Sequence, residues 1–519
     1  MPKTIGDALE WHARFTPNKQ AVVEANALST APVTTLTYGQ LWMRACALAN
    51  GMRSLGVGPG DRIAILMLNS ARYMEVYHAI ALIGCAAVPL NFRFIAAEID
   101  YIVNHSKAKA LFLDAAFEPV VRGMRERLPS LGIILISTDA RAPGCVDYED
   151  LLAKSPATSP NVDVDRDECF FQGYTAGTTG SPKGCVDLHG AFVDFFKRVA
   201  LYYGVGPNDV ELVPAPLFHA APTLFALLQI FRGGTVVVTR ESQPEALLRL
   251  IAEFKITWAF MVPTMWDSIV SAKEVRSSHR SSMRLLLSAG APLLTHTKNA
   301  MLKYFPDASL NEYYGATEVG IVTNLCGEDQ HRKVRSVGTP IPGFAVRLVD
   351  DDGRDVAQGE VGEIYIRGPM LMREYFMNPE ATAAARHGDW FSVGDMGRFD
   401  EEGYLYIVDR KKDMIITGGE NVYPAEIEAV LYQHPAVAMT AVVGIPDPKW
   451  GEIIYAAVVL KNGEAASESI LADHCAQHLA RFKIPKKFAF VDRLPTSSFG
   501  KILRREVRRP FWEREDAAV

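Results

Sequence analysis

Residues 62–90 read RIAILMLNSARYMEVYHAIALIGCAAVPL. Residues 62–68 form a mostly apolar run that predicts a buried strand, and residues 72–83 carry a helical pattern. A second short apolar run follows at residues 86–90, so strand, helix and strand succeed one another in one short stretch. Such alternation is typical of βαβ units on a parallel sheet, and it predicts an α/β fold.

The same alternation recurs on both sides of this stretch. A helix is expected after residues 36–38, and a second series of strands, separated by helical stretches, is expected further along the chain. The strands of that series are expected at residues 210–213, 235–239, 258–262 and 284–289. Residues 141–160 are rich in proline, serine, alanine and aspartate, which predicts a surface connection before the second series. Two parallel βαβ-type sheets are therefore expected.

After about residue 337 the pattern changes to short apolar runs separated by turns, which indicates a β-rich subdomain. Its strands are expected at residues 345–349, 363–367 and 403–408. From residue 412 a small α+β pattern begins, with a helix that starts at Pro424. We therefore predict a large N-terminal domain at residues 1–411, followed by a small, mobile α+β domain at residues 412–519.

Composition excludes several classes of protein. The chain has 519 residues, of which 49% are hydrophobic and 22% charged, and its net charge of −6 gives no basic surface for nucleic acid. Seven cysteines without a C-x-x-C pair favour a reducing cytoplasm over a disulfide framework or a zinc site. The start of the chain lacks the apolar core of a signal peptide, and the longest apolar stretch is about half of a membrane span. We expect a cytoplasmic monomer or homodimer without an integral membrane segment, while peripheral membrane contact stays open.

A segment rich in glycine and threonine carries the first chemical signal. Residues 174–184 read YTAGTTGSPKG. Glycines let backbone amides approach an anion, the threonine hydroxyls can donate hydrogen bonds, and Lys183 adds a positive charge, so the segment predicts a phosphate cradle. A flexible surface loop is the alternative interpretation. The segment is not a Walker A loop, because Gly184 follows the lysine where that motif requires serine or threonine.

Further motifs stand downstream of this loop. They read YGATE at 314–318, GD at 394–395, DR at 409–410, GGEN at 418–421 and PTSSFGK at 495–501. With the loop, they resemble the motifs of the adenylate-forming superfamily, in its acyl-CoA synthetase branch of fatty-acid, aryl and coumarate-type CoA ligases. The resemblance extends over residues 38–504. Each motif alone is weak, but their number and order make the match specific.

The resemblance implies a two-step, AMP-forming ligase reaction. The carboxylate of an acid attacks the α-phosphorus of ATP and pyrophosphate leaves, and coenzyme A then displaces AMP to give an acyl-CoA. Because carboxylate and phosphate repel each other, cations and oriented dipoles must offset their charge in the transition state. ATP and coenzyme A are thus implied as co-substrates, with Mg²⁺ and a small carboxylic acid.

The resemblance also assigns the contacts to the phosphates and the metal. Thr317 is expected to contact the α-phosphate, and Glu318 to hold Mg²⁺, a hard cation that prefers oxygen ligands. Without the motif, Glu318 would be interpreted as a solvated acid. The residues assigned to the pyrophosphate portion of ATP are Thr175, Thr178, Thr179, Gly180 and Lys183.

The nucleoside is assigned in the same way. Tyr314 is expected to stack on adenine, with small residues as the opposite wall; a core aromatic is the alternative for this tyrosine. Asp395 is expected to accept hydrogen bonds from both ribose hydroxyls, and Arg410 to reach the same ribose. The full set assigned to the nucleoside is Ala289, Gly290, Ala291, Tyr313, Tyr314, Gly315, Asp395 and Arg410.

Lys501 resembles the lysine on the last loop of the small domain, which bridges the carboxylate and the α-phosphate during adenylation. A solvated basic tail is the alternative, because arginines follow at 504, 505, 508 and 509. Lys412 occupies the hinge position of the family. Rotation at this hinge is expected to withdraw Lys501 and to present Gly418 and Gly419 to the pantetheine arm of coenzyme A.

Three residues depart from the family pattern. Ala176 replaces a usual serine, and the loss of one hydrogen bond of about 1 kcal/mol predicts weaker ATP binding. Cys185 stands where an aliphatic residue is usual, and we interpret it as a buried, inert thiol because no histidine–aspartate pair accompanies it. Phe499 replaces a small polar residue before Gly500, which leaves the ammonium of Lys501 in place.

The segment Leu217–His219 resembles the one whose histidine lies beside the acyl group, and His219 is a candidate catalytic residue with Lys501, Glu318 and Thr317. A satisfied core histidine is the alternative for His219. The residues expected around it are Ala220, Ala221, Pro222, Thr223, Phe225, Val262, Ile321 and Val322. Because these segments are nearly all apolar and hold no arginine, we expect a medium- to long-chain fatty acid or an aromatic acid of the benzoate or cinnamate type.

Two alternative functions stay open from the sequence. An enzyme of this kind could deliver its acyl-adenylate to a carrier protein or oxidise it, as luciferases do, although the GGEN segment and WGE at 450–452 favour coenzyme A. A non-catalytic fatty-acid or nucleotide-binding protein is disfavoured by the presence of both Glu318 and Lys501.

Overall fold

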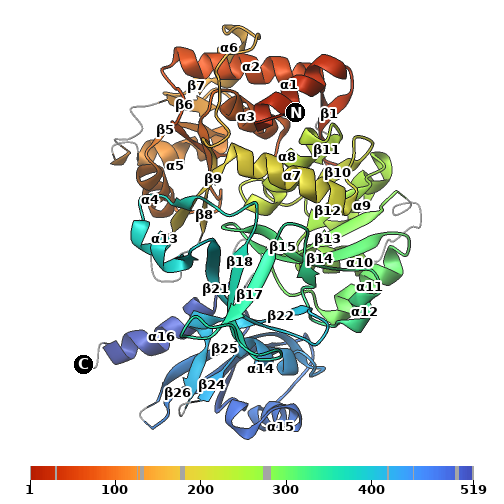
Figure 1. The fold of residues 1–519 in the computed structure, drawn as a ribbon, viewed down its shortest axis with the longest axis vertical. Helices are drawn as coiled ribbons and strands as arrows, with labels where there is room; N and C mark the ends of the chain where they lie inside the picture. Colours follow the sequence, from red (N-terminus) through yellow and green to blue (C-terminus); the bar gives the residue numbers. More distant parts are fainter. Residues whose placement is uncertain are drawn as a thin grey trace. The chain divides into compact units, whose positions relative to one another are not determined.

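The computed structural model describes residues 2–29, 32–124, 127–128, 134–175, 182–272, 282–417, 420–447, 449–496 and 502–516 (Figure 1). The chain divides into two compact units. The first comprises Met1–Ala345 and Ile366–Phe391, and the second Val346–Tyr365 and Ser392–Val519. The predicted domain boundary between residues 411 and 412 lies within the second unit and stays a prediction.

A nine-stranded sheet in the first unit has the order β16-β15-β14-β13-β12-β10-β11-β1-β2. The strands are β1 (Gln20–Glu24), β2 (Thr34–Thr37), β10 (Val210–Val213), β11 (Thr235–Val238), β12 (Trp258–Met261), β13 (Leu285–Ser288), β14 (Ser309–Ala316), β15 (Gly320–Cys326) and β16 (Thr339–Pro340). The series from β14 to β1 is parallel, whereas β2, β15 and β16 pair antiparallel. The strands predicted for β10 to β13 are confirmed to within one residue at each end.

An eight-stranded sheet in the same unit has the order β19-β9-β8-β4-β3-β5-β6-β7. Its strands are β3 (Arg62–Leu66), β4 (Ala86–Pro89), β5 (Ala108–Leu113), β6 (Ile134–Ser137), β7 (Val146–Asp147), β8 (Cys169–Thr175), β9 (Lys183–Leu188) and β19 (Glu374–Tyr375). The predicted βαβ unit is confirmed, since α3 (Ala71–Leu82) joins the parallel strands β3 and β4. Ser70 caps this helix, because its hydroxyl accepts a hydrogen bond of 3.2 Å from the backbone N–H of Tyr73.

Helices cover these sheets. They are α1 (Ile5–Phe15), α2 (Tyr38–Ser54), α3, α4 (Ala96–Ser106), α5 (Glu118–Gly123), α6 (Tyr148–Ala153), α7 (His189–Tyr203), α8 (Ala220–Phe231), α9 (Pro244–Glu253), α10 (Pro263–Val270), α11 (Thr295–Tyr304), α12 (Asp329–Arg332) and α13 (Pro379–Ala385). The prediction of a surface connection at residues 141–160 is wrong in part. Strand β7 and helix α6 lie in it, because Tyr148 is buried and its hydroxyl donates to the carboxylate of Glu75. No helix in the described part of the chain is both long and apolar enough to span a bilayer.

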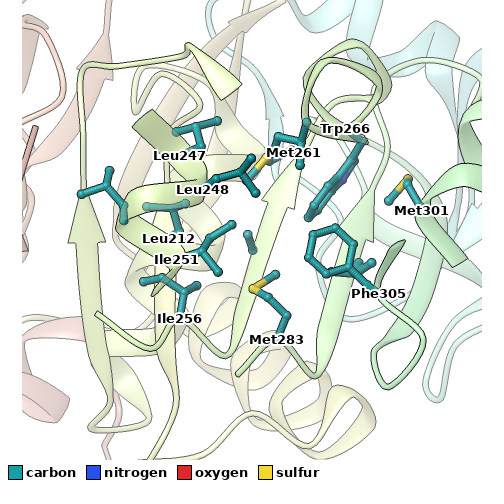
Figure 2. Packing of buried hydrophobic residues seen from close by; sticks show 14 of the residues in the cluster. Leu212, Leu247, Leu248, Ile251, Ile256, Met261, Trp266, Met283, Met301 and Phe305 are labelled. Carbon is teal, nitrogen blue, oxygen red and sulfur yellow. The ribbon is translucent and has the colours of Figure 1, made fainter. Parts of the chain in front are cut away.

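A hydrophobic cluster fixes the ends of the nine-stranded sheet. Figure 2 shows residues of α9, α10 and α11 packed with residues of β10 and β12, among them Leu247, Leu212 and Met261. Trp266 of α10 is fully buried, and its indole N–H donates a 3.0 Å hydrogen bond to the carbonyl of Leu287 in β13. Each such side chain stabilises the fold by roughly 1.5–3 kcal/mol through burial. The strands that lead to the candidate residues are therefore packed against helices through a hydrophobic core.

After about residue 337 short strands follow one another, as predicted for a β-rich subdomain, and the chain from residue 412 is α+β, as predicted. One sheet has the order β17-β18-β21-β20 with β22 on β21, and another has the order β24-β23-β26-β25 with β27 on β26. The strands are β17 (Ala345–Val349), β18 (Gly362–Arg367), β20 (Arg386–His387), β21 (Trp390–Phe399), β22 (Leu405–Arg410), β23 (Ile415–Thr417), β24 (Glu420–Val422), β25 (Val437–Asp447), β26 (Gly451–Leu460) and β27 (Lys487–Phe490). The helices are α14 (Pro424–Leu431), α15 (Glu468–His478) and α16 (Arg504–Asp516). Strand β22 begins two residues later than predicted, because Gly403 lies in a turn with φ of +81°.

Candidate functional site

Candidate residues follow the carboxyl ends of neighbouring parallel strands in the nine-stranded sheet. His219 follows β10, Val262 follows β12, and residues 289–291 follow β13. The register pairs Ser288 of β13 with Glu312 of β14, and residues 289–291 and 313–315 directly follow these two paired residues. In open α/β sheets, ligands bind outside the carboxyl ends of the strands. The sheet thus gathers the candidates for adenine and for the acyl group at one edge.

The two adjacent tyrosines of β14 occupy opposite faces of the strand, since side chains alternate along it. Tyr313 is buried, and its ring centroid lies 5.9 Å from that of Phe225 and 5.8 Å from that of Phe260. Tyr314 is half-buried. Tyr313 therefore belongs to the core, and Tyr314 is the tyrosine available to a flat ligand.

Gly315 lies at an irregularity in the pairing of β14 with β15. A Cβ atom at this position would stand 2.1 Å from the carbonyl oxygen of Gly320, so only glycine permits this close approach of the two strands. Gly290 has φ of +87°, a conformation that glycine adopts without strain. The close approach of Gly315 and Gly320 makes the turn between β14 and β15 tight, and this turn carries Thr317 and Glu318.

Glu318 is 8% exposed, and two hydroxyl groups lie within hydrogen-bonding distance of its carboxylate. Tyr375 Oη donates to Oε1 over 3.0 Å, and Thr175 Oγ1 lies 3.4 Å from the same oxygen. Tyr375 belongs to β19, which pairs with β9 at Cys185. Three segments far apart in the sequence thus meet at one carboxylate.

These oxygen donors fit a magnesium site. Mg²⁺ in nucleotide enzymes is held by one or two carboxylates together with substrate phosphates and water. Within the residues that the structure describes, no group of three or more histidine, cysteine, aspartate and glutamate side chains could form an all-protein metal cage. The role of Glu318 as a ligand of Mg²⁺ stays a prediction.

Two further candidates lie beside this carboxylate. Lys183 Nζ lies 4.9 Å from the centroid of the Tyr375 ring. Thr317 Cγ2 would be 3.2 Å from a Cβ atom built on Gly173 in β8, so Thr317 packs close to that strand. Thr175 pairs with Lys183 across β8 and β9, and these two residues flank the loop between the strands. The candidates Thr178, Thr179 and Gly180 and the departure Ala176 lie outside the described residues.

Cys185, which departs from the family pattern, lies in a buried and negatively charged environment. The thiol is fully buried, and burial, together with the negative charge of Glu318, raises its pKa well above the ordinary value. The same two causes raise the pKa of Asp187, the next residue on that face of β9. A thiol with a raised pKa is a poor nucleophile, which supports the interpretation of Cys185 as inert.

His219 precedes α8 and packs against aromatic residues. Its ring centroid lies 4.0 Å from that of Phe218, which in turn meets the ring of Phe92 edge-on at 5.3 Å. Burial, and then the positive charge of Arg93, lowers the pKa of His219 well below its usual value, so the imidazole is neutral near pH 7. Arg93 is not among the candidates that the sequence indicated, because this arginine follows β4 in the other sheet. It is exposed, and water screens its charge.

The ribose candidates lie in the second unit. Asp395 of β21 and Arg410 of β22 are direct partners in the antiparallel register, and Arg410 Nε lies 3.0 Å from Asp395 Oδ1. Lys412 lies in a single 3-10 turn, Lys411–Asp413. The candidates Gly418, Gly419 and Lys501 and the departure Phe499 lie outside the described residues.

Comparisons with known proteins identify the family of the chain. Residues 9–376 match the family model described as AMP-binding enzyme, and residues 426–501 match that of the AMP-binding enzyme C-terminal domain. A feruloyl-CoA synthase from Amycolatopsis sp is 37% identical over 96% of this chain and 97% of its own. A long-chain-fatty-acid–CoA ligase from Mycobacterium tuberculosis is 35% identical over 98% of this chain and 99% of its own. The solved structure of o-succinylbenzoate CoA synthetase from Bacillus subtilis, in complex with its acyl-adenylate intermediate, is 30% identical with a TM-score of 0.85, over 96% of this chain and 97% of that one.

Proposed function

The chain belongs to the AMP-binding enzyme family of the adenylate-forming superfamily, and on this premise we propose how its residues join a carboxylic acid to coenzyme A. The protein is an AMP-forming acid–CoA ligase that uses ATP, coenzyme A and Mg²⁺ and acts on fatty or aromatic acids. The observation that carries the proposed mechanism is the meeting of Thr175, Tyr375 and Glu318 beside Lys183. The test is AMP formation that requires ATP, an acid and coenzyme A together.

At the phosphate end, Glu318 would hold Mg²⁺, and Tyr375 and Thr175 orient its carboxylate through the hydroxyl contacts described above. When bound, the ion would supply positive charge that offsets the charge of the phosphates. Thr317 contacts the α-phosphate. Lys183 and the loop with Thr178, Thr179 and Gly180 bind the pyrophosphate portion and stabilise it as it leaves.

At the nucleoside end, Tyr314 stacks on adenine, with Ala289, Gly290 and Ala291 as the opposite wall. The half-buried position of Tyr314 supports this role. Asp395 accepts hydrogen bonds from the ribose hydroxyls, and its ion pair with Arg410 supports a shared contact with that ribose. A carboxylate suits this task because it only accepts hydrogen bonds and the two hydroxyls donate.

The two half-reactions use different residues of the small domain. Lys501 bridges the carboxylate and the α-phosphate during adenylation. Rotation at Lys412, at the boundary between residues 1–411 and 412–519, then replaces Lys501 with Gly418 and Gly419 for attack by the thiol of coenzyme A. Delivery to a carrier protein is the second candidate for this step. Release of AMP that requires free coenzyme A distinguishes the two.

We expect Gly419→Leu to leave pyrophosphate release unchanged and to slow thioester formation by about tenfold or more. A leucine side chain would occupy the path of the thiol and displace the thiol from the position in which it reacts. Both half-reactions are measured separately, with Lys461→Leu as the control that adds leucine at an exposed site of the same unit. Equal defects in both half-reactions would mean that Gly419 is needed for folding and not for the thiol.

The substrate is expected to be an apolar monocarboxylate. Each methylene buried beside Phe225, Val262 and Ile321 gains about 0.8 kcal/mol, or about fourfold in kcat/KM, whereas an unpaired buried carboxylate costs several kcal/mol. We expect kcat/KM for octanoate and for a cinnamate to exceed that for malonate by about 100-fold or more. Arg93→Ala is the control, because this exposed arginine is the nearby cation and its loss should leave the order unchanged. Malonate as the best of the three acids would contradict this view of the pocket.

The cellular location is a further part of the proposal. All seven cysteines are free in the structure, which supports the reducing cytoplasm expected from the sequence. The monomeric or homodimeric state stays a prediction. Peripheral contact with a membrane also stays open.

A further inference from the structure

Arg504, the first residue of α16, gathers several carboxylates around its guanidinium group. It forms a bidentate ion pair with Glu428, in which Nε donates to Oε1 over 2.9 Å and Nη2 donates to Oε2 over 2.5 Å. Its Nη1 donates to Asp409 Oδ1 over 2.6 Å and lies 3.7 Å from Asp413 Oδ2. The arginine side chain is 20% exposed and that of Asp409 only 2%, so water screens these contacts weakly.

The carboxylates come from the elements around the predicted hinge. Asp409 lies near the end of β22 and shortly before Lys412, Asp413 directly follows Lys412, and Glu428 lies in α14. Asp409 also accepts the backbone N–H of Ala425 over 2.8 Å, and Glu428 accepts that of Val442 over 2.9 Å. Burial raises the pKa of Asp409, and the positive charge of Arg504 opposes that rise. Arg504 is therefore the shared counter-charge of the cluster.

The same arginine borders the base of the loop that carries Lys501. Thr496 and Ile502 pair as an antiparallel bridge, and the backbone N–H of Leu503 donates to the carbonyl of Pro495 over 2.9 Å. Ile502 also packs against a cluster of buried apolar residues that includes Leu494. Arg504 follows this base directly, so its side chain ties the base to β22 and α14.

We propose that Arg504 is a positioning residue for the adenylation half-reaction. Its bidentate ion pair with Glu428 and its contact with Asp409 fix the position of residues 495, 496, 502 and 503, which flank the segment with Lys501. The proposal rests on the proposed role of Lys501 in that half-reaction. A planar guanidinium fixes two partners in direction as well as distance, which the single ammonium of a lysine cannot do. A misplacement of a catalytic group by 1 Å costs about 100-fold in rate. Formation of the thioester does not use Lys501, and it is spared.

The test is Arg504→Lys in the full chain, which keeps the positive charge and loses the bidentate geometry of the guanidinium. Pyrophosphate release from ATP and octanoate is expected to fall by about 10- to 100-fold. Thioester formation from supplied octanoyl-adenylate and coenzyme A should stay within about twofold of wild type, and the melting temperature should fall less than in a variant that also loses the positive charge. The matched control is Arg505→Lys on the next residue, whose side chain is 66% exposed and lies 3.5 Å from Glu506. This control should leave both half-reactions unchanged.

A second variant separates positioning from stability. Arg504→Gln leaves the carboxylates without their counter-charge and should melt lower, whereas Arg504→Gln with Glu428→Gln removes one charge of each sign and should recover part of that loss. Adenylation should stay slow in the double variant. The proposal is overturned if Arg504→Lys adenylates at the wild-type rate, or if both half-reactions fall equally. Lys501→Ala distinguishes the two failures, since retained adenylation there would remove the role of Lys501 itself.

Discussion

Replacing Lys501 with alanine is expected to lower pyrophosphate release from ATP and acid by about 10²–10³-fold or more, the cost of removing a preorganised charge from a transition state. The ammonium is needed where the carboxylate meets the α-phosphate, and alanine leaves that repulsion without an offset. The second half-reaction proceeds after pyrophosphate has left. Conversion of supplied acyl-adenylate to thioester should therefore continue near the wild-type rate, and single-turnover measurements of both steps check this.

Lys487→Ala is the matched control for this variant. Lys487 is an exposed lysine in β27 of the same unit, and its loss tests whether a general reduction in positive charge slows adenylation. Both half-reactions should keep their rates in that control. Equal loss of both steps in Lys501→Ala would contradict a role confined to adenylation.

Local patterns predicted most of the parallel strands, because each is a short apolar run between helical stretches. The strands predicted for β10 to β13 and the helices α3 and α14 lie where the sequence placed them. The antiparallel edge strands were not predicted. Strand β19 contains only Glu374 and Tyr375, which is too short to show alternation, and its partner β9 lies far away in the sequence.

In the candidate site, too, local sequence patterns did not indicate residues that only strand pairing brings together. The resemblance named Thr175 and Glu318, and the structure places hydroxyl and carboxylate 3.4 Å apart. Tyr375 was missed although its contact with Glu318 is shorter, at 3.0 Å. No motif marks this tyrosine, and only the pairing of β19 with β9 brings it to the carboxylate. Arg93 was missed for the same reason, since it follows a strand of the other sheet and affects His219 only through its charge.

The basic run after Lys501 illustrates what charge alone cannot tell. Arg504 and Arg505 are adjacent and identical in type, and the sequence allowed both to be a solvated tail. The side chain of Arg504 is 20% exposed and that of Arg505 is 66% exposed. The difference arises from the start of α16, which turns one arginine toward Asp409 and Glu428 and leaves the other in water.

Glu318→Gln is expected to lower the overall rate by about 100-fold or more at ordinary Mg²⁺ concentrations, because it removes the negative charge of a metal ligand and keeps its shape. The amide oxygen can still accept the hydrogen bond from Tyr375. The melting temperature should therefore stay near that of wild type. Titration of the rate with Mg²⁺ should show a weaker apparent affinity for the metal.

The matched control for Glu318→Gln is Glu374→Gln. Glu374 precedes Tyr375 in β19 and pairs at 3.3 Å with the neighbouring Arg373 at the surface, so the same change of charge occurs close by without touching the proposed metal ligand. Its rate and its Mg²⁺ dependence should match those of wild type, since surface ion pairs contribute only about 0–1 kcal/mol. If Glu318→Gln kept the wild-type rate and the wild-type Mg²⁺ dependence, the ion would have to be held by other groups, and the hydroxyls of Thr175 and Tyr375 would serve only to satisfy a buried carboxylate.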